Sequence, residues 1–173
     1  VTSIVGIWQF KVTFTGIQNH AGTTRMAIRK DAGLAAVKYL LAVDETFPKV
    51  CGPRTVWTTG RITLDPGAPS IIPGKAEVLF QIRDDNPETL ARLETTLREL
   101  AATADKNGPC TVEVEALRKS TPAIMDTGFQ ASLEAAAAAH AGGKCTRMPS
   151  GAGHDAQTLS TVMPAGMLFV PSI

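Results

Sequence analysis

Cysteine is scarce in this sequence. The three cysteines, Cys51, Cys110 and Cys145, lie far apart in the chain, and no Cys-X-X-Cys pair occurs. An odd number of cysteines at wide spacing is not the pattern of a disulfide framework or of a zinc site built on cysteine pairs. We therefore expect reduced thiols and a cytoplasmic protein.

An excess of charge of one sign is also lacking. The 17 Lys and Arg residues nearly balance the 16 Asp and Glu residues, which leaves a formal net charge of +1. Proteins that bind nucleic acids or membrane surfaces through bulk electrostatics normally carry a strong basic excess. No apolar run approaches the roughly 18 residues that span a bilayer, so the sequence predicts no transmembrane segment. The 44% apolar and 19% charged residues are typical of a folded globular chain, and 173 residues suffice for one average domain or two small ones.

Common catalytic motifs are missing as well. None of the three histidines belongs to a His-Glu-X-X-His motif, and no carboxylate stands beside them at a recognised ligand spacing. A catalytic zinc needs three protein ligands, and a two-metal site needs more. No Gly-X-Ser-X-Gly, Walker or dinucleotide-binding fingerprint occurs. We therefore expect this chain to bind no metal ion by itself.

The hydrophobic pattern of the first 50 residues predicts a strand and then a helix. Apolar residues alternate with polar ones at 8–15, which is typical of a half-buried strand. A helix should follow at 28–45, and Pro48, Gly52 and Pro53 should end it. The apolar residues that recur there at helical spacing are Leu34, Val37 and Leu41.

The next 70 residues predict two strands, a second helix and a further strand. The strands lie at 55–64, with Gly60 as a candidate bulge, and at 76–83. Asn86 is a plausible N-cap of the helix, and the last strand lies at 110–117. The order β-α-β-β-α-β is that of the ferredoxin-like sandwich, a four-stranded antiparallel sheet with two helices on one face. We therefore predict an α+β fold.

The last 50 or so residues are too few for a core of their own. They contain a predicted helix capped by Asp126, a Gly-rich loop at 149–155, a short helix and a terminal strand at 167–173. This segment should belong to a second domain. Because the chain opens with the strand-like residues 1–5 and ends on a strand without a following turn, we expect an interior piece of a longer protein.

Four side chains could carry chemistry, and each has a plainer alternative. His20 lies in a loop between a strand and a helix, so it is either an exposed loop residue or a ligand contact. His140 should satisfy the last-turn carbonyls of its helix. His154 and Asp155 lie at a helix start, where Asp155 could cap the helix, and capping and function remain equally open. Arg83 is either on a solvated sheet face or a clamp for a carboxylate.

Three sequence blocks point to a family. The chain resembles the hydantoinase/carbamoylase branch of the two-metal amidohydrolases and aminopeptidases, which includes N-carbamoyl-L-amino-acid hydrolases, β-ureidopropionases and allantoate amidohydrolases. The blocks occur in family order and cover nearly the whole chain. They are Gln18 to Met26 with Arg29 to Ala32, Ala68 to Gly74 with Phe80 to Asp84, and Ser150 to Gln157 with Met167 to Ser172.

The resemblance implies roles for individual residues. The histidine that matches His20 helps to stabilise the tetrahedral intermediate, and the arginine that matches Arg83 holds the substrate carboxylate. Ser70 stands where some carbamoylases have a substrate-contacting asparagine, and Gly151 matches a backbone contact to the substrate. We also predict that His154, in the third block, contacts the substrate.

The resemblance also implies an architecture. Residues 6–120 would form a ferredoxin-like lid that carries a homodimer contact, while 1–5 and 121–173 would belong to the catalytic domain. Two divalent ions (zinc, manganese, cobalt or nickel) would serve the parent enzyme, with their ligands outside this chain. The parent should hydrolyse the C–N bond of N-carbamoyl amino acids or of ureido compounds such as allantoate, whereas this chain alone should be inactive.

A non-enzymatic ferredoxin-like module is the alternative, serving in dimerisation, in small-molecule binding or in RNA recognition. RNA-recognition domains of this topology need exposed aromatic residues on the first and third strands. Here Phe80 shares its strand face with Val78 and Ile82, and the opposite face is polar. The pattern therefore disfavours RNA binding.

Overall fold

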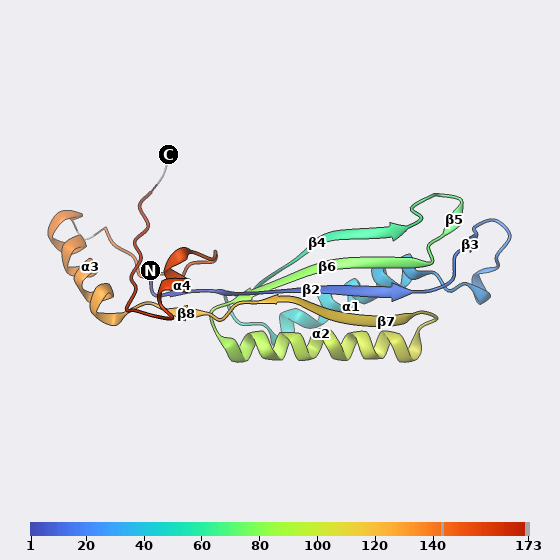
Figure 1. Ribbon diagram of the computed structural model, residues 1–173, viewed down its shortest axis with the longest axis horizontal. Coiled ribbons are helices and arrows are strands. Elements are labelled where there is room, and N and C mark those ends of the chain that lie inside the picture. Colours follow the sequence, from blue (N-terminus) through green and yellow to red (C-terminus); the bar gives the residue numbers. More distant parts are fainter. Residues whose placement is uncertain (143, 172–173) are drawn as a thin grey trace.

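The molecule is elongated, with a long sheet, two helices along it and a smaller group of elements beyond one end (Figure 1). This computed structural model describes residues 1–142 and 144–171. Its elements in chain order are β1 (Ser3–Ile4), β2 (Gly6–Thr15), β3 (Asn19–His20), η1 (Met26–Ile28), α1 (Ala32–Val50), β4 (Val56–Asp65), β5 (Ile71–Ile72), β6 (Lys75–Asp84), α2 (Pro87–Asn107), β7 (Thr111–Lys119), β8 (Ala123–Ile124), α3 (Thr127–His140) and α4 (Asp155–Leu159).

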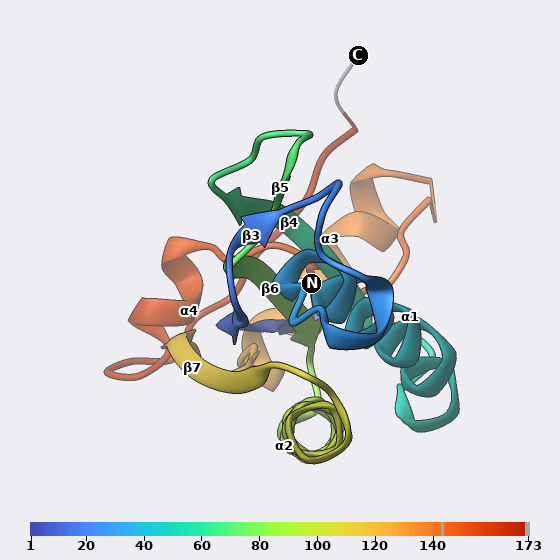
Figure 2. The same ribbon diagram turned by 90° about the vertical axis from the view of Figure 1, so that its right-hand side faces the viewer.

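The main sheet is antiparallel throughout, and its strand order is β4-β6-β2-β7. Both α1 and α2 lie on the same side of it, as the end view in Figure 2 shows. This is the predicted α+β, ferredoxin-like arrangement, which is thereby confirmed. The register of β4 against β6 shifts between Thr59 and Arg61, so Gly60 forms the predicted irregularity.

The core lies between the sheet and the helices. Phe47 of α1 packs edge-on against Phe80 of β6 and Trp57 of β4, with ring centroids 5.7 and 5.5 Å away. Each fully buried large apolar side chain contributes about 1.5–3 kcal/mol. The buried residues include alternate positions of the two central strands and one stripe of α2, namely Phe10, Val12, Phe14, Ala76, Val78, Phe80, Ile82, Leu90, Leu93 and Leu97.

Side-chain caps set the starts of the helices. The Asn86 side chain accepts a hydrogen bond from the Thr89 amide at 2.9 Å, and the Asp126 side chain accepts one from the Phe129 amide at 2.8 Å. Both predicted N-caps are therefore confirmed, and Pro87 occupies the first turn of α2, where no amide partner is required.

The bounds of α1 differ from the predicted helix. It begins after Asp31, whose carboxylate accepts a hydrogen bond from the Leu34 amide at 2.9 Å. It also continues through Pro48 to Val50, so Pro48 does not end the helix, whereas the end does fall just before Gly52 and Pro53, as predicted. Pro48 lies in the last turn of the helix, where the loss of its own N–H hydrogen bond does not prevent the next residues from staying helical. One turn later the Cys51 amide still donates to the Phe47 carbonyl at 2.9 Å.

The apolar residues that identified this helix do not face the core. Leu34, Val37 and Leu41 are 42%, 59% and 57% exposed, and we call these three residues the α1 stripe. The opposite side of α1 is buried through Ala36, Tyr39, Val43 and Phe47. The Tyr39 hydroxyl donates to the Leu97 carbonyl of α2 at 3.0 Å, and burial raises the pKa of Tyr39.

The C-terminal segment differs most from the prediction. No strand forms at 167–171, and Ser172 and Ile173 lie outside the described residues. A strand forms when its backbone groups hydrogen-bond to a neighbouring strand. Among the described residues, the backbone of Met167 makes one such contact, in which its carbonyl accepts a hydrogen bond from the Val1 amino group at 2.9 Å. The alternative that Asp155 caps the short helix is excluded, because His154 occupies the N-cap position of α4 and Asp155 is its first residue.

Candidate functional site

The predicted site residues fall into two groups. His20 in β3 and Ser70, directly before β5, form what we call the tip group, since β3 and β5 pair with each other beyond the sheet. Arg83 near the end of β6 lies beside Gly151, and with His154 these residues form what we call the base group. Sequence reasoning assigned all five residues to one site but could not place them relative to one another.

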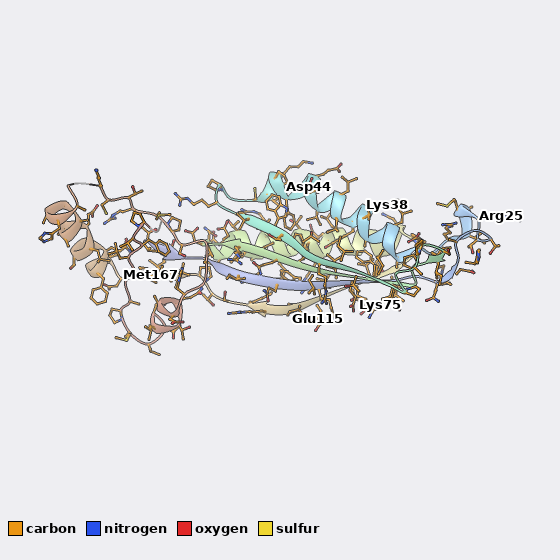
Figure 3. All side chains as sticks on the ribbon, turned by 90° about the horizontal axis from the view of Figure 1, so that it is seen from above. Arg25, Lys38, Asp44, Lys75, Glu115 and Met167 are labelled. Carbon is orange, nitrogen blue, oxygen red and sulfur yellow. The ribbon has the colours of Figure 1, made fainter. Side chains whose placement is uncertain are left out.

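The two groups lie at opposite ends of the molecule. Figure 1 shows β3 and β5 at one end of the sheet and β8 and α4 at the other. Figure 3 likewise shows Arg25, in the same loop as His20, and Met167 at opposite ends. The ten residues of β2 run between the groups and span about 33 Å at roughly 3.3 Å per residue. One copy of the chain therefore cannot bring both groups to the same small substrate.

The tip group is built from two loops that pair as short strands. His20 pairs with Ile71, and the Ala21 amide donates to the Ser70 carbonyl at 2.9 Å. The two residues lie 50 positions apart in the sequence and are adjacent here because β2 and β6 are neighbours in the sheet. Both side chains are exposed.

Hydrogen bonds fix the tautomer of His20. Its Nδ1 atom accepts the Gly22 amide at 3.0 Å and the Thr23 amide at 3.3 Å. A backbone N–H can only donate, so Nδ1 carries no proton and the neutral ring holds its proton on Nε2. The exposed side of the ring thus offers a hydrogen-bond donor, the group needed to stabilise a developing oxyanion.

Arg29 supports the same loop, a role that the sequence analysis missed. Its Nε donates to the Thr24 carbonyl at 3.0 Å, and its Nη2 donates to the Ala21 carbonyl. One rigid guanidinium therefore holds both sides of the turn that carries His20. The only sequence signal was its presence in the first of the three blocks.

In the base group, Arg83 connects the sheet to the Gly-rich loop. Its Nε donates to Gln81 Oε1 at 2.6 Å, and its Nη1 donates to the Gly151 carbonyl at 2.9 Å. These contacts use two of the five guanidinium N–H donors and hold the plane of the group. The remaining donors are available for a planar carboxylate.

His154 stands on the same loop, and its ring has two neighbours. Its Nε2 lies 2.9 Å from Ser150 Oγ, and its ring meets Phe169 edge-on at 5.5 Å between centroids. His140, by contrast, is the exposed last residue of α3 and belongs to neither group.

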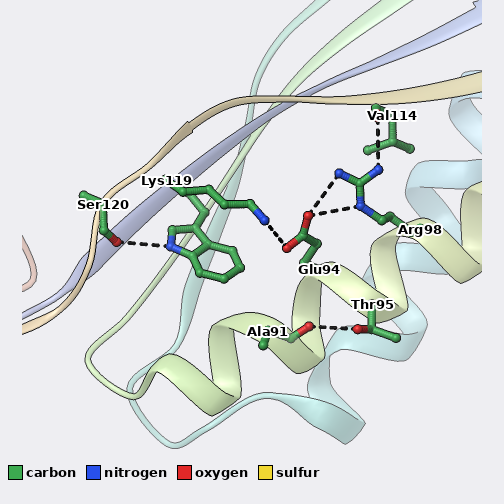
Figure 4. Close-up of polar contacts among 8 residues, drawn as sticks. Ala91, Glu94, Thr95, Arg98, Val114, Lys119 and Ser120 are labelled. Atoms are coloured by element: carbon green, nitrogen blue, oxygen red, sulfur yellow. Dashed lines mark hydrogen bonds and ion pairs between the residues drawn. The ribbon is translucent and has the colours of Figure 1, made fainter.

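An ion-pair network braces the junction between β7 and the start of β2 (Figure 4). Glu94 of α2 binds both Lys119 and Arg98, and the Lys119 ammonium also lies 4.4 Å from the ring centre of Trp8. The Trp8 indole N–H donates to the Ser120 carbonyl at 3.1 Å. Partial burial alone would raise the pKa of Glu94, but the hydrogen bonds from Lys119 and Arg98 outweigh it and hold that pKa below its ordinary value.

Several other kinds of site find no support in the described part of the chain. No three His, Cys, Asp or Glu side chains at 1–142 or 144–171 lie close enough together to hold a metal ion. Within those residues no helix is both long and apolar enough to cross a bilayer. Phe10 and Phe80 are buried beneath the helices, so these two central-strand aromatics form no exposed stacking surface for RNA bases.

Comparison with known proteins gives the family. Residues 2–109 match the peptidase dimerisation domain. The chain is 34% identical over 180 residues to allantoate amidohydrolase of Bacillus subtilis and 31% identical over 173 residues to N-carbamoyl-L-amino-acid amidohydrolase of Paenarthrobacter aurescens. Each alignment covers 99% of this chain and 41% of the relative.

A solved structure is similar over nearly the whole chain. The hydantoinase/carbamoylase-family amidase from Burkholderia phymatum superposes with a TM-score of 0.89 at 44% identity, covering 95% of this chain and 41% of that protein. The resemblance inferred from the three sequence blocks is confirmed. The chain spans about two fifths of the length of these relatives.

Proposed function

This chain belongs to the peptidase dimerisation domain family, and from that premise we propose that it is the dimerisation and substrate-contacting part of a metal-dependent amidohydrolase. The reaction would be hydrolysis of a C–N bond in an N-carbamoyl amino acid or in a ureido compound such as allantoate. The names of the two curated relatives support this substrate class. Residues 6–120 would be the lid, and 1–5 and 121–173 would belong to the catalytic domain, in the cytoplasm.

The observation that carries the proposal is the separation of the tip group from the base group. Because about 33 Å of strand lies between them, a complete site requires the tip group of one copy and the base group of another. A closed two-fold dimer satisfies both sites at once, since each copy gives its tip group and receives its partner's. The name of the matching domain family supports such a homodimer.

The residues would then divide the work at each site. His20 would donate its Nε2 proton in a hydrogen bond to the carbonyl oxygen on which negative charge develops. Arg83 would bind the substrate carboxylate through its remaining donors, beside the Gly151 backbone. Ser70 would contact the substrate from the same side as His20, and His154 from the same side as Arg83.

The dimer surface would comprise the α1 stripe and the free edge of β4. Val56, Ile62 and Leu64 of β4 are 53%, 49% and 40% exposed, and β4 has no neighbour on its outer side among the described strands. The two elements are contiguous, because Leu64 lies within 3.4 Å of the Cβ position at Gly33 of α1. A second copy would cover this apolar surface and pair the open edge.

The metal ions would be bound by residues outside this chain. The described residues hold no cluster of His, Cys, Asp or Glu that fits a metal centre. Two divalent ions, whether zinc, manganese, cobalt or nickel, would polarise the substrate carbonyl or activate water. The chain's own residues would only orient the substrate and stabilise charge.

The test is an assay of the longer protein that contains this chain, with release of ammonia measured on N-carbamoyl amino acids, allantoate and ureidoglycolate. We expect one of these substrates to be hydrolysed, and hydrolysis to cease after chelation of metal. A protein that forms dimers but hydrolyses none of them would support the non-catalytic alternative and overturn the enzymatic proposal.

A further inference from the structure

Ser150 directly precedes Gly151 of the base group and is held by its backbone. Only 2% of it is exposed. Its amide donates to the Ser3 carbonyl at 2.7 Å, its carbonyl accepts the Val5 amide at 3.1 Å, and it forms a parallel bridge with Ile4. The segment 3–5 leads directly into β2, so the Gly-rich loop is anchored to the base of the sheet at this residue.

The hydroxyl of Ser150 has three polar neighbours. It lies 2.9 Å from the Ala152 carbonyl, 3.2 Å from the Ala152 amide and 2.9 Å from His154 Nε2. A serine hydroxyl has one proton to donate and two lone pairs to accept with. The carbonyl can only accept and the amide can only donate. All three contacts are satisfied together only if Oγ donates to the carbonyl and accepts a proton from His154 Nε2.

From this arrangement we infer that Ser150 is a positioning residue that presents Nδ1 of His154 to the substrate as a hydrogen-bond acceptor. With its proton on Nε2, the neutral ring keeps its lone pair on Nδ1. Among the described residues Nδ1 has no hydrogen-bond partner, and the Phe169 ring packs edge-on with its centroid 5.5 Å from that of the imidazole. This role rests on the proposed function, and no motif in the sequence assigned it.

The two histidines would then be complementary. His20 offers a donor from Nε2, because backbone amides occupy its Nδ1. His154 offers an acceptor from Nδ1, because Ser150 occupies its Nε2. An amide or ureido group presents a carbonyl oxygen, which accepts, and an N–H, which donates. Such a substrate between the tip group of one copy and the base group of the other could satisfy both rings at once.

The first test reads the tautomer directly. In nitrogen-15 NMR spectra of the 173-residue chain at alkaline pH, we expect the proton of His154 on Nε2 and slow exchange of that proton with water. In Ser150→Ala the exchange should become fast. The matched control is Ser3→Ala. Ser3 is also buried, and its carbonyl accepts the Ser150 amide, but its hydroxyl donates to Asp85 at 2.7 Å and not to His154. A proton on Nδ1 in the unmutated chain would overturn the inference without any variant.

The second test separates positioning from mere support of the fold. In the longer protein, Ser150→Ala should lower kcat/KM roughly 10-fold, which is the effect of losing one hydrogen bond in the site. In a His154→Ala background the same substitution should change kcat/KM less than about 2-fold, because its effect acts through that ring. An equal loss in both backgrounds would overturn the positioning role. Absence of any amidohydrolase activity would instead refute the proposed function, and the NMR experiment would still decide the bond between Ser150 and His154.

Discussion

His20 and Arg83 should differ in the stage of the reaction at which each matters. The proton on His20 Nε2 is aimed at charge that develops only in the transition state, whereas a carboxylate bound by Arg83 is present before and during the reaction. In the longer protein, His20→Ala should lower kcat by about 10²–10³-fold with little change in KM. Arg83→Ala should mainly raise KM. Steady-state kinetics on the best substrate separates the two.

Arg61 supplies the control for the arginine. It lies on the open face of the sheet together with Arg83, but it contacts neither Gln81 nor Gly151 by a hydrogen bond. Arg61→Ala should therefore leave KM unchanged. A rise in KM equal to that of Arg83→Ala would point to general loss of positive charge instead of a carboxylate clamp.

The residue types in the two groups could be predicted from the sequence, but their chemical states could not. The block around His20 identified a candidate, yet its tautomer depends on the amides of Gly22 and Thr23 pointing at Nδ1. Likewise the Ser150 hydroxyl matters because of where the Ala152 backbone lies. Such contacts arise from loop geometry, which no periodicity encodes.

At the scale of the elements, an ion pair between Glu94 and Lys119 joins α2 to β7. The pKa of Glu94 is lower in the folded chain than the ordinary value of 4.5, so the pair contributes stability above that value and loses it as the pH falls through the folded-state pKa. Glu94→Gln should lower the melting temperature at neutral pH by the equivalent of roughly 1 kcal/mol. In acid the variant and the unmutated chain should converge. Calorimetry across the acid range measures this difference.

Glu134 provides the comparison for Glu94. It also lies on a helix and pairs with an arginine, Arg147, at 2.8 Å, but both side chains are more than half exposed. Solvent and salt screen such a pair, so Glu134→Gln should change the melting temperature little at any pH. An equal effect of the two substitutions would mean that net charge, and not the braced junction, sets the acid stability.

The exposed face of α1 should decide the oligomeric state. Val37 lies in the α1 stripe and is 59% exposed, so Val37→Asp should leave the fold intact but place a charge in the proposed dimer surface. Light scattering at micromolar concentration should show twice 18.2 kDa for the unmutated chain and 18.2 kDa for the variant. Leu117→Asp, on the opposite edge strand β7 and 48% exposed, should remain dimeric. A monomeric Leu117→Asp with a dimeric Val37→Asp would place the interface at β7.

Helical spacing predicted that α1 exists but not which of its faces is buried. By composition, the side of α1 that carries Leu34, Val37 and Leu41 looks like the side to be buried. The core instead contains Tyr39 and Phe47 from the other side of the helix. A helix with apolar residues on two sides has two surfaces to cover, and the sequence does not say which one is covered by its own sheet. For α2 the apolar residues that lie at helical spacing, Leu90, Leu93 and Leu97, form a single stripe, and all three are buried.

At the scale of the whole molecule, nothing in the sequence pattern predicts that the site residues lie far apart. Arg83 and His20 belong to blocks of one family signature, and only the lengths and directions of β2 and β6 reveal that they lie at opposite ends of the sheet. The length of each strand could be predicted to within a few residues. Which strand ends lie at the same edge of the sheet, however, depends on the order and direction in which the strands pair. That order became visible only with the fold.

This separation makes a test by subunit exchange possible. Suppose that each site takes its tip group from one copy and its base group from the other. A mixed dimer of His20→Ala and Arg83→Ala then contains one site with both defects and one site with neither. Equal amounts that exchange at random give half mixed dimers, so at a substrate concentration far below the KM of the Arg83→Ala dimer, activity should recover to about a quarter of the unmutated level.

The matched control is a mixture of His20→Ala with Ser70→Ala. Both substitutions lie in the tip group, so every site of that mixed dimer contains one of the two defects, and activity should not rise above the average of the two parent variants. Native mass spectrometry should establish that subunits exchange in both mixtures. If exchange occurs and the His20→Ala and Arg83→Ala mixture stays inactive, each site takes both residues from a single copy. The tip group and the base group would then have to approach each other by a rearrangement of the sheet, and the shared-site dimer would be refuted.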